Sequence, residues 1–131
     1  MEFVRKHKTQ TGHINVSCPE LTAVDLVENE KSVGGLNRVC TVLNELVETM
    51  DLDSLDDSFF KTSAIPVFQR LGYILEHVLE RADLAETLYS KMEVAGLKFR
   101  KIPFKINKPT EGCEVDKKWK VIINQEIEID E

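Results

Sequence analysis

The stretch LNRVCTVLNELVETM, residues 36–50, decides the fold class of this chain. Its apolar residues recur at intervals of three and four, the spacing that places side chains on one face of an α-helix. These residues are Leu36, Val39, Cys40, Leu43, Leu46, Val47 and Met50. The pattern predicts an amphipathic helix with one continuous face against a hydrophobic core, and Gly34-Gly35 in front of it predicts a turn.

A second helical segment spans residues 65–79. Its apolar residues keep the same period: Ile65, Phe68, Leu71, Leu75, Val78 and Leu79. Pro66 falls in the first turn, where a missing backbone N–H costs nothing. Gly72 costs about 1 kcal/mol relative to alanine inside a helix, so we expect it to allow another backbone to approach closely. A last helix is predicted from Asp83, as its N-cap, to a stop at Gly96.

Shorter helices are predicted on either side of residues 36–50. Ser17 with Glu20 matches a capping box, and Pro19 suits the first turn of a helix that ends before Gly34. Residues 52–61 predict a further short helix. Its predicted caps are Asp51 or Asp53.

The two ends of the chain carry β-prone pieces. Residues 3–16 predict a hairpin or two edge strands around Gly12. Near the C-terminus two sets of apolar residues alternate with polar ones and predict two strands: Ile102, Phe104 and Ile106, and then Trp119, Val121 and Ile123. Residues 107–118 between them predict a polar connection. Pro103 restricts the first of these strands to an edge. The predicted fold class is α+β, a bundle of about four to five helices packed with short N- and C-terminal antiparallel strands.

The composition indicates one globular domain over residues 1–131, with 42% hydrophobic and 31% charged residues. No run approaches the roughly 18 apolar residues of a membrane span, and the N-terminus lacks a secretory signal, so we expect a cytoplasmic protein without membrane contact. The net charge of −6 disfavours wholesale nucleic-acid binding, although a local basic face stays open. Three cysteines, Cys18, Cys40 and Cys113, have no disulfide or zinc spacing and are interpreted as small hydrophobes.

Patterns that support catalysis or metal binding are missing from the sequence. His7, His13 and His77 have no metal-ligand spacing and are interpreted as solvated or capping residues. The Gly34-Gly35 pair lacks the rest of a phosphate loop, although the helix start behind it can hold an anion. The acidic residues 51–57 lack the glycine and the closing glutamate of a calcium loop. We therefore expect a protein that is not an enzyme and has no catalytic residues, metal or cofactor.

Two polar pairs lie beside the apolar stripes: Asn37 with Arg38, and Gln69 with Arg70. A guanidinium group suits a carboxylate within the fold, and it suits a phosphate or a partner protein equally well. Structural pairing is the favoured interpretation, and contact with a partner stays open. The candidate partner- or phosphate-binding residues are Asn37, Arg38, Gln69 and Arg70.

Several stretches together carry a family resemblance: SCPELTAVDLV at 17–27, GGLNRV at 34–39 with TVLNEL at 41–46, QRLGYIL at 69–75 and, more weakly, WKVIIN at 119–124. They resemble the C-terminal domain of the AbiEi antitoxins of abortive-infection toxin–antitoxin systems, from about residue 3 to about residue 128. The first stretch is similar to the family signature S-T-P-E-x-T-A-x-D-L-V, with Cys18 in place of the usual threonine.

The resemblance implies an antitoxin whose cognate toxin is of the nucleotidyltransferase type and is encoded beside it. Family members usually carry an N-terminal winged helix-turn-helix domain that binds operator repeats and represses transcription, followed by a C-terminal domain needed to neutralise the toxin. This chain begins where the second domain would begin, so we expect DNA contact only through a separate or missing N-terminal domain. The acidic balance departs from members whose C-terminal domain shows a basic face. Arg38 and Arg70 are then the expected polar anchors, with Asn37 and Gln69 beside them.

Two alternatives belong to other classes of protein. An enzyme that modifies the toxin or a nucleotide requires a pocket that unites residues such as Asp25, Arg38 and Arg70. A structural dimerisation domain requires an apolar interface between two copies of the chain.

Overall fold

The structure is a computed structural model that describes residues 4–6, 15–17, 19–53, 55, 57–106 and 108–127. For residues 4–6, 15–17, 57 and 58 it describes the backbone alone. The predicted strand segments at residues 3 and 7–14, and the expected roles of His7, His13 and Cys18, lie outside these residues.

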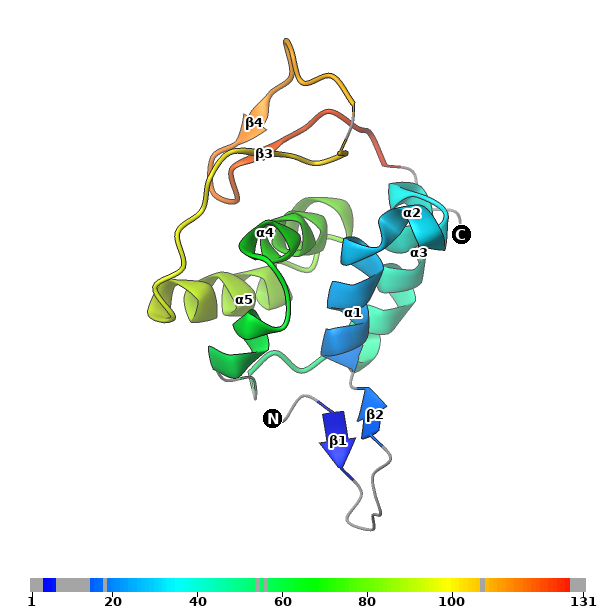
Figure 1. Cartoon of the computed structure of the whole chain (residues 1–131), viewed down its shortest axis with the longest axis vertical. Helices are drawn as coiled ribbons and strands as arrows, with labels where there is room; N and C mark the ends of the chain where they lie inside the picture. Colours follow the sequence, from blue (N-terminus) through cyan, green and yellow to red (C-terminus); the bar gives the residue numbers. More distant parts are fainter. Residues whose placement is uncertain are drawn as a thin grey trace.

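Five α-helices and three short helices of other types follow one another in the described part of the chain. The α-helices are α1 (Pro19–Glu28), α2 (Glu30–Val33), α3 (Leu36–Leu46), α4 (Ile65–Tyr73) and α5 (Ala82–Val94). The short ones are the 3₁₀ helices η1 (Val47–Thr49) and η2 (Asp57–Lys61) and the π-helix η3 (Ile74–Val78), which continues α4. Figure 1 shows α1, α2 and α3 on one side of the molecule and α4 with α5 on the other.

Five short strands form two small sheets at opposite ends of the molecule (Figure 1). At the N-terminal end, β1 (Val4–Lys6) pairs antiparallel with β2 (Asn15–Ser17). At the C-terminal end, β3 (Ile102–Pro103), β4 (Val115–Asp116) and β5 (Val121–Ile122) form a sheet in the order β3-β5-β4. The predicted α+β class, with helices between short terminal strands, is confirmed.

The C-terminal sheet differs from the expectation in two details. Strand β3 runs parallel to β5, with Ile102 opposite Val121, whereas an antiparallel pair was expected. Strand β4 lies within residues 107–118, which were expected to be a connection without a strand. The alternation of apolar residues does not indicate the direction in which two strands pair, and a strand of two residues such as β4 is too short to show that alternation.

The core forms where the predicted amphipathic helices meet. Helix α3 buries Leu36, Val39, Cys40 and Leu43, as its periodicity predicted. Helix α4 buries Phe68 and Leu71, and Phe68 meets the rings of Phe59 and Phe60 with centroids 5.4 and 5.1 Å away. The residues around η2 are thus anchored by their aromatic rings, although η2 is shorter than the helix predicted over residues 52–61.

Gly72 marks a close approach of another part of the chain, but the neighbour is a side chain. A Cβ atom added at Gly72 would lie 2.2 Å from the indole carbon Cη2 of Trp119. The expectation of an approaching backbone was therefore wrong, because the indole ring of a fully buried tryptophan fills the space. Glycine is required here since any larger residue would displace that ring.

The predicted helix ends were partly right. Gly96 ends α5 with φ +76°, and the Leu97 N–H donates to the Met92 carbonyl at 3.1 Å, which is a Schellman ending. Asp83 is not the N-cap of α5; that position belongs to Arg81, whose Nε donates to Asp83 Oδ1 at 3.2 Å. The carboxylate therefore pairs with a nearby cation instead of capping the helix.

The remaining cap predictions concern acidic residues. Glu20, expected in a capping box with Ser17, is buried and its Oε2 accepts a hydrogen bond from the Asp51 N–H. The side chain of Ser17 is outside the described atoms. Asp51 Oδ1 accepts a bond from the Asp53 N–H at 3.1 Å, which closes a turn well before η2 begins.

Candidate interaction site

Residues 97–106 and 108–127, which we call the strap, cross the surface of α4 and carry the C-terminal sheet. Gln69 of α4 joins two parts of the strap. Its side chain is fully buried, and Nε2 donates to the carbonyl oxygens of Arg100 at 2.9 Å and Trp119 at 2.7 Å. One amide group thus bridges the two chain segments that run into β3 and β5.

Arg70, the next residue of α4, contacts the strap at Pro103 of β3. Its Nε donates to the Pro103 carbonyl at 2.9 Å, and 9% of the residue is exposed. Burial lowers the pKa of the Arg70 guanidinium, and the negative charge of Glu30 partly offsets that effect. The group stays protonated because the ordinary pKa of arginine lies far above neutrality.

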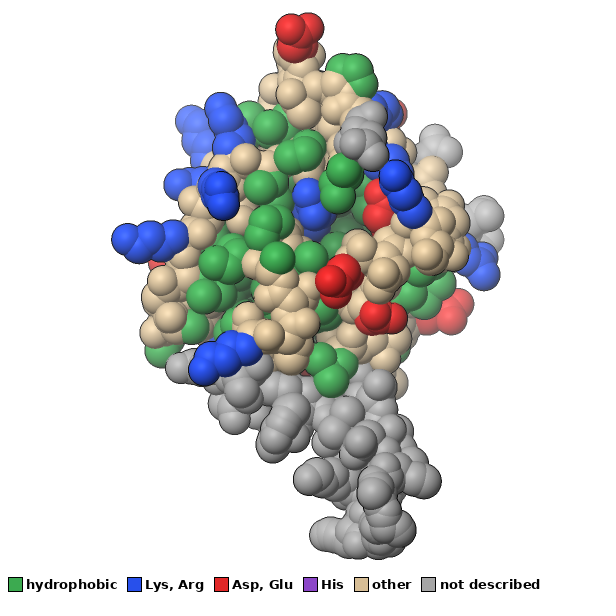
Figure 2. Space-filling view, in the orientation of Figure 1, with side chains coloured by type: hydrophobic (Ala, Val, Ile, Leu, Met, Phe, Trp, Pro, Cys, Tyr) green, Lys and Arg blue, Asp and Glu red, His purple; other side chains and the backbone are tan. Residues whose placement is uncertain are grey.

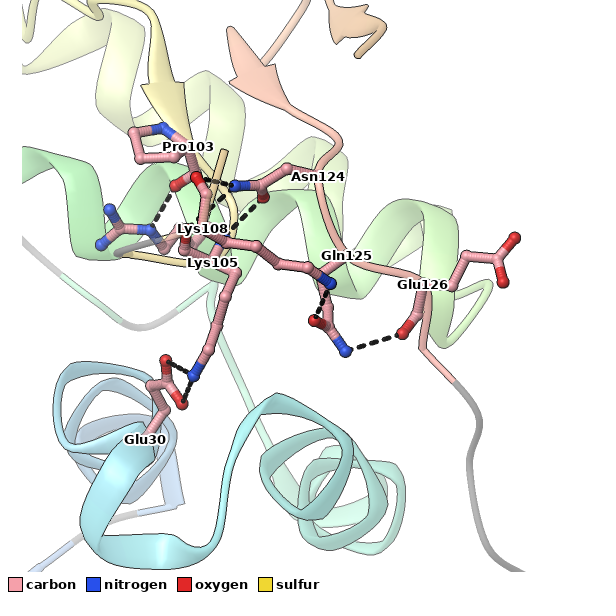
Figure 3. Close-up of polar contacts among 8 residues, drawn as sticks. Glu30, Pro103, Lys105, Lys108, Asn124, Gln125 and Glu126 are labelled. Atoms are coloured by element: carbon pink, nitrogen blue, oxygen red, sulfur yellow. Dashed lines mark hydrogen bonds and ion pairs between the residues drawn. The ribbon is translucent and has the colours of Figure 1, made fainter. Parts of the chain in front are cut away.

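Glu30 of the helical body (residues 19–94) and Asn124 of the strap itself make further polar contacts (Figure 3). Glu30 of α2 is buried and accepts two hydrogen bonds from Lys105 Nζ, at 2.9 and 3.1 Å. The Asn124 side chain accepts a bond from the Lys105 N–H at 2.8 Å and donates to the carbonyls of Lys105 and Lys108. The close-up shows the Glu30 pair reaching from the helices to the strap, so polar bonds fasten this segment from several sides.

Asn37 and Arg38 lie elsewhere, exposed in the first turn of α3. Gly34 and Gly35 precede them with φ angles of +120° and +102°, a conformation that favours glycine. The predicted turn is therefore confirmed. The structure thus separates the four candidate residues into an exposed pair on α3 and a pair on α4 that bonds to the strap.

A second polar cluster surrounds the edge of the Trp119 indole ring. Trp119 Nε1 donates to Glu76 Oε1 at 2.9 Å, and Lys118 Nζ lies 3.2 Å from the same oxygen and also pairs with Glu86. Burial acts to raise the pKa of Glu76, but the hydrogen bonds from Trp119 and Lys118 outweigh it and the pKa falls below its ordinary value. The carboxylate of η3 is thus held in its charged form beneath the strap.

A groove of about 360 Å³ lies between η3 and the end of the strap. Tyr73, His77, Phe104 and Ile127 are among the residues that line it. His77 Nε2 is 3.0 Å from Asp116 Oδ1, so this histidine pairs with a carboxylate of β4. Burial and the nearby charge of Asp116 raise the pKa of the Tyr73 hydroxyl, which keeps it protonated at neutral pH.

A comparable groove of about 370 Å³ runs along α1, where Leu21, Asp25, Glu28 and Thr62 contribute to its walls. Throughout the part of the chain that the structure describes, no three His, Cys, Asp or Glu residues gather as a metal site would require. None of the helices in the described ranges combines the length and the apolar character that crossing a membrane requires.

Glu30, Lys105 and Asn124 were not among the residues singled out from the sequence. Their contacts join residues 16 to 75 positions apart, and such pairs leave no local pattern. The one signal available was Asn124, a polar residue directly after the alternating apolar positions of the last strand.

Comparison with known proteins places the chain in a family. The model of the AbiEi antitoxin C-terminal domain matches residues 3–77, which include β1, β2 and α1 to α4. The match ends earlier than the resemblance traced through the sequence to about residue 128, so α5 and the strap lie beyond it. Searches of curated proteins and of solved structures returned no match. Because the match covers more than half of the chain, the protein belongs to the AbiEi antitoxin C-terminal domain family.

Proposed function

We propose that this chain is the antitoxin domain of a toxin–antitoxin pair and neutralises a nucleotidyltransferase-like toxin encoded beside it, in the cytoplasm. The observation that carries the proposal is the family match over residues 3–77, which spans four of the five α-helices described. The polar contacts of the described residues also support action by binding, because Gln69, Arg70 and Glu76 use their polar groups to hold the fold together.

The exposed turn that begins α3 is the proposed contact surface for the partner. Arg38 is exposed there beside Asn37, and it forms no ion pair with any residue that the structure describes. The N-cap of α3 is Gly35, which has no side chain and therefore makes no side-chain cap hydrogen bond to the first turn. Helix dipole and guanidinium therefore present positive charge at one place, which suits a carboxylate or phosphate group of a partner.

Gln69 and Arg70 have a supporting role in this proposal. Their donors bond to carbonyls of the strap, so replacing them changes the position of the strap before it changes any contact with a partner. Transcriptional autoregulation is assigned to the chain only in combination with a winged helix domain, which reads the operator.

Co-expression with the adjacent toxin tests the proposal. The wild-type chain should restore growth of cells that express the toxin, and Arg38→Gln should weaken this protection at equal protein level. Lys61→Gln is the matched control, because it removes an exposed positive charge from η2, away from α3. Failure of the wild-type chain to protect contradicts the proposed function, whereas full protection by Arg38→Gln contradicts only the proposed surface.

A further inference from the structure

The groove between η3 and the end of the strap has walls from both parts of the molecule. Tyr73 lies at the end of α4 and His77 in η3, whereas Phe104, Ile123 and Ile127 belong to the strap. The volume of about 360 Å³ lies within the range of roughly 300–1,000 Å³ that is typical of sites for small molecules. A ligand in this groove would touch the helical body and the strap at once.

The apolar part of the groove consists of aromatic rings and branched side chains. The rings of Tyr73 and Phe104 meet edge to face with centroids 5.0 Å apart, and the His77 ring lies at the same distance from Tyr73. Ile123 and Ile127 are only partly buried, so each still has apolar surface to cover. Because aromatic rings pack well against the edges and faces of other rings, these walls favour a ligand with an aromatic body.

Tyr73 also brings a polar group to the groove. Only 8% of the residue is exposed, yet its hydroxyl forms no hydrogen bond with any residue that the structure describes. Removing a hydroxyl from water is costly unless another partner replaces the water. Burial and the charge of Asp116 raise the pKa of this hydroxyl, so at neutral pH it is protonated and can either donate or accept a hydrogen bond.

Two further groups that line the groove are acceptors. His77 Nε2 is 3.0 Å from Asp116 Oδ1, so in the neutral ring Nε2 carries the proton and Nδ1 is left as an acceptor. Glu126 is exposed, and its backbone carbonyl accepts a bond from Gln125 Nε2, whereas its carboxylate has no partner among the residues drawn in Figure 3. The Lys108 ammonium donates to Gln125 and not to Glu126. The groove therefore suits a donor with a positive charge.

We propose that this groove binds a small aromatic amine, with the ring between the apolar walls and the protonated amine among Tyr73, His77 and Glu126. A primary ammonium group has three N–H donors and no acceptor, which matches a hydroxyl oxygen, a ring nitrogen and a carboxylate. Its positive charge also interacts favourably with the faces of aromatic rings. A ligand with a carboxylate would meet the like charge of Glu126 and leave the His77 acceptor without a donor.

This proposal goes beyond the antitoxin function and does not rest on it. Tyr73 and His77 lie within the matched residues 3–77, but Phe104, Glu126 and Ile127 lie beyond them. The family match therefore does not cover the groove as a whole. Because the ligand contacts both parts of the molecule in their folded arrangement, its binding should stabilise the strap on the helical body.

An NMR titration of the full ¹⁵N-labelled chain with tryptamine tests the proposal. Tryptamine should shift the backbone amide signals of Val78, Ile123 and Gln125 at the groove and leave that of Val39, in the core, unchanged. We expect a dissociation constant of about 1 mM or lower, as a ligand of this size can reach.

Two comparison ligands separate the amine from the ring. Indole-3-propionate has the same ring and chain length but a carboxylate in place of the ammonium group. Nα-acetyl-lysine amide has the ammonium group without the ring, in the form that a partner protein would present. Each should bind at least tenfold more weakly than tryptamine, because each lacks one half of the match.

Two variants remove single polar groups from the groove. Tyr73→Phe keeps the ring that contacts His77 and Phe104, and Glu126→Gln changes an exposed side chain, so both should remain folded. Each should weaken tryptamine binding at least fivefold. Glu111→Gln removes an exposed carboxylate from another part of the strap and should leave the affinity unchanged. Since Glu126 is exposed, the second variant is informative even if the first disturbs the fold.

Three results would overturn the proposal. The first is that the groove amides do not shift at 10 mM tryptamine. The second is that indole-3-propionate or the lysine amide binds as tightly as tryptamine, because the groove would then select only the ring or only the amine. The third is that either variant, shown to be folded by circular dichroism, binds tryptamine with the wild-type affinity.

Discussion

The helical body over residues 19–94 and the strap differ in how much they depend on polar bonds. Inside the body, apolar side chains pack against each other, as Val39, Leu43 and Phe68 do without any exposure. The strap adds Phe104, Trp119 and Val121 to the same core. Its strands are short, however, and it is also held by hydrogen bonds from Gln69 and Arg70, two buried polar residues of the body. The packing of the body therefore follows from the periodicity of its own helices, whereas the position of the strap depends on groups that the body supplies. Figure 2 shows how the side chains of both parts are distributed on one face of the molecule.

Loss of the largest side chain that the strap buries should have the largest effect. Trp119→Ala removes a fully buried indole that fills the space above Gly72, so we expect a loss of about 3–5 kcal/mol in the free energy of unfolding. Urea denaturation followed by circular dichroism measures this loss. Val94→Ala is the control, because that side chain is 84% exposed and its loss should stay within about 0.5 kcal/mol. Equal effects of the two variants would show that Trp119 does not anchor the strap.

The contact between Gly72 and Trp119 can be tested from the other side. Gly72→Ala places a methyl group 2.2 Å from the indole ring, so we expect a loss of about 2–3 kcal/mol in the free energy of unfolding. Trp119→Leu removes the indole ring that the added methyl group would meet. The double variant should therefore be clearly less destabilised than the sum of the two single variants. Additive losses in the same urea titration would mean that the two residues do not meet.

Asn124 allows the polar bonds within the strap to be measured alone. Asn124→Ala leaves the Lys105 N–H and the carbonyls of Lys105 and Lys108 without their partner, and we expect a cost of about 1–2 kcal/mol. Gln125→Ala removes two exposed hydrogen bonds, one from Lys108 Nζ and one to the Glu126 carbonyl, and should cost less than about 0.5 kcal/mol. If thermal unfolding ranks the two variants in the opposite order, Asn124 does not hold the two parts of the strap together.

The smallest expected effect is a pH dependence from Glu76. Its pKa is lower in the folded state, so the stability it contributes is present above the ordinary pKa of 4.5 and is lost as the pH falls through the folded value. The free energy of unfolding of the wild type should therefore fall more steeply below pH 4.5 than that of Glu76→Gln. Glu111→Gln, at an exposed position of the strap, is the matched control and should retain the wild-type slope. Identical acid profiles of Glu76→Gln and the wild type would contradict the assignment.

The features that could be predicted from the sequence lie mainly in the helical body. Helix α3 was predictable because its buried residues repeat with the helical period, and Gly96 was predictable as a stop because a left-handed residue favours glycine. The close approach at Gly72 was also expected, but the ring that fills the space comes from a residue 47 positions later, at Trp119. Distant neighbours of this kind leave no local signal.

The candidate residues were predictable as polar positions beside apolar stripes, and their roles were not. Gln69 bonds to Arg100 and Trp119, which lie 31 and 50 positions away, so no spacing in the sequence indicates whether its amide is buried or exposed. Lys101 and Lys120 lie at neighbouring positions for the same reason, since only the parallel pairing of β3 and β5 brings their two segments together.

Native-state hydrogen exchange of Gln69→Leu tests most directly whether the body positions the strap. The amides to follow are Ile102 and Phe104, which donate to the carbonyls of Lys120 and Ile122, and Val39 in the first turn of α3. We predict that the variant speeds exchange at Ile102 and Phe104 at least tenfold and leaves Val39 within twofold of the wild type. An equal acceleration at all three amides, or none at Ile102 and Phe104, would contradict the account.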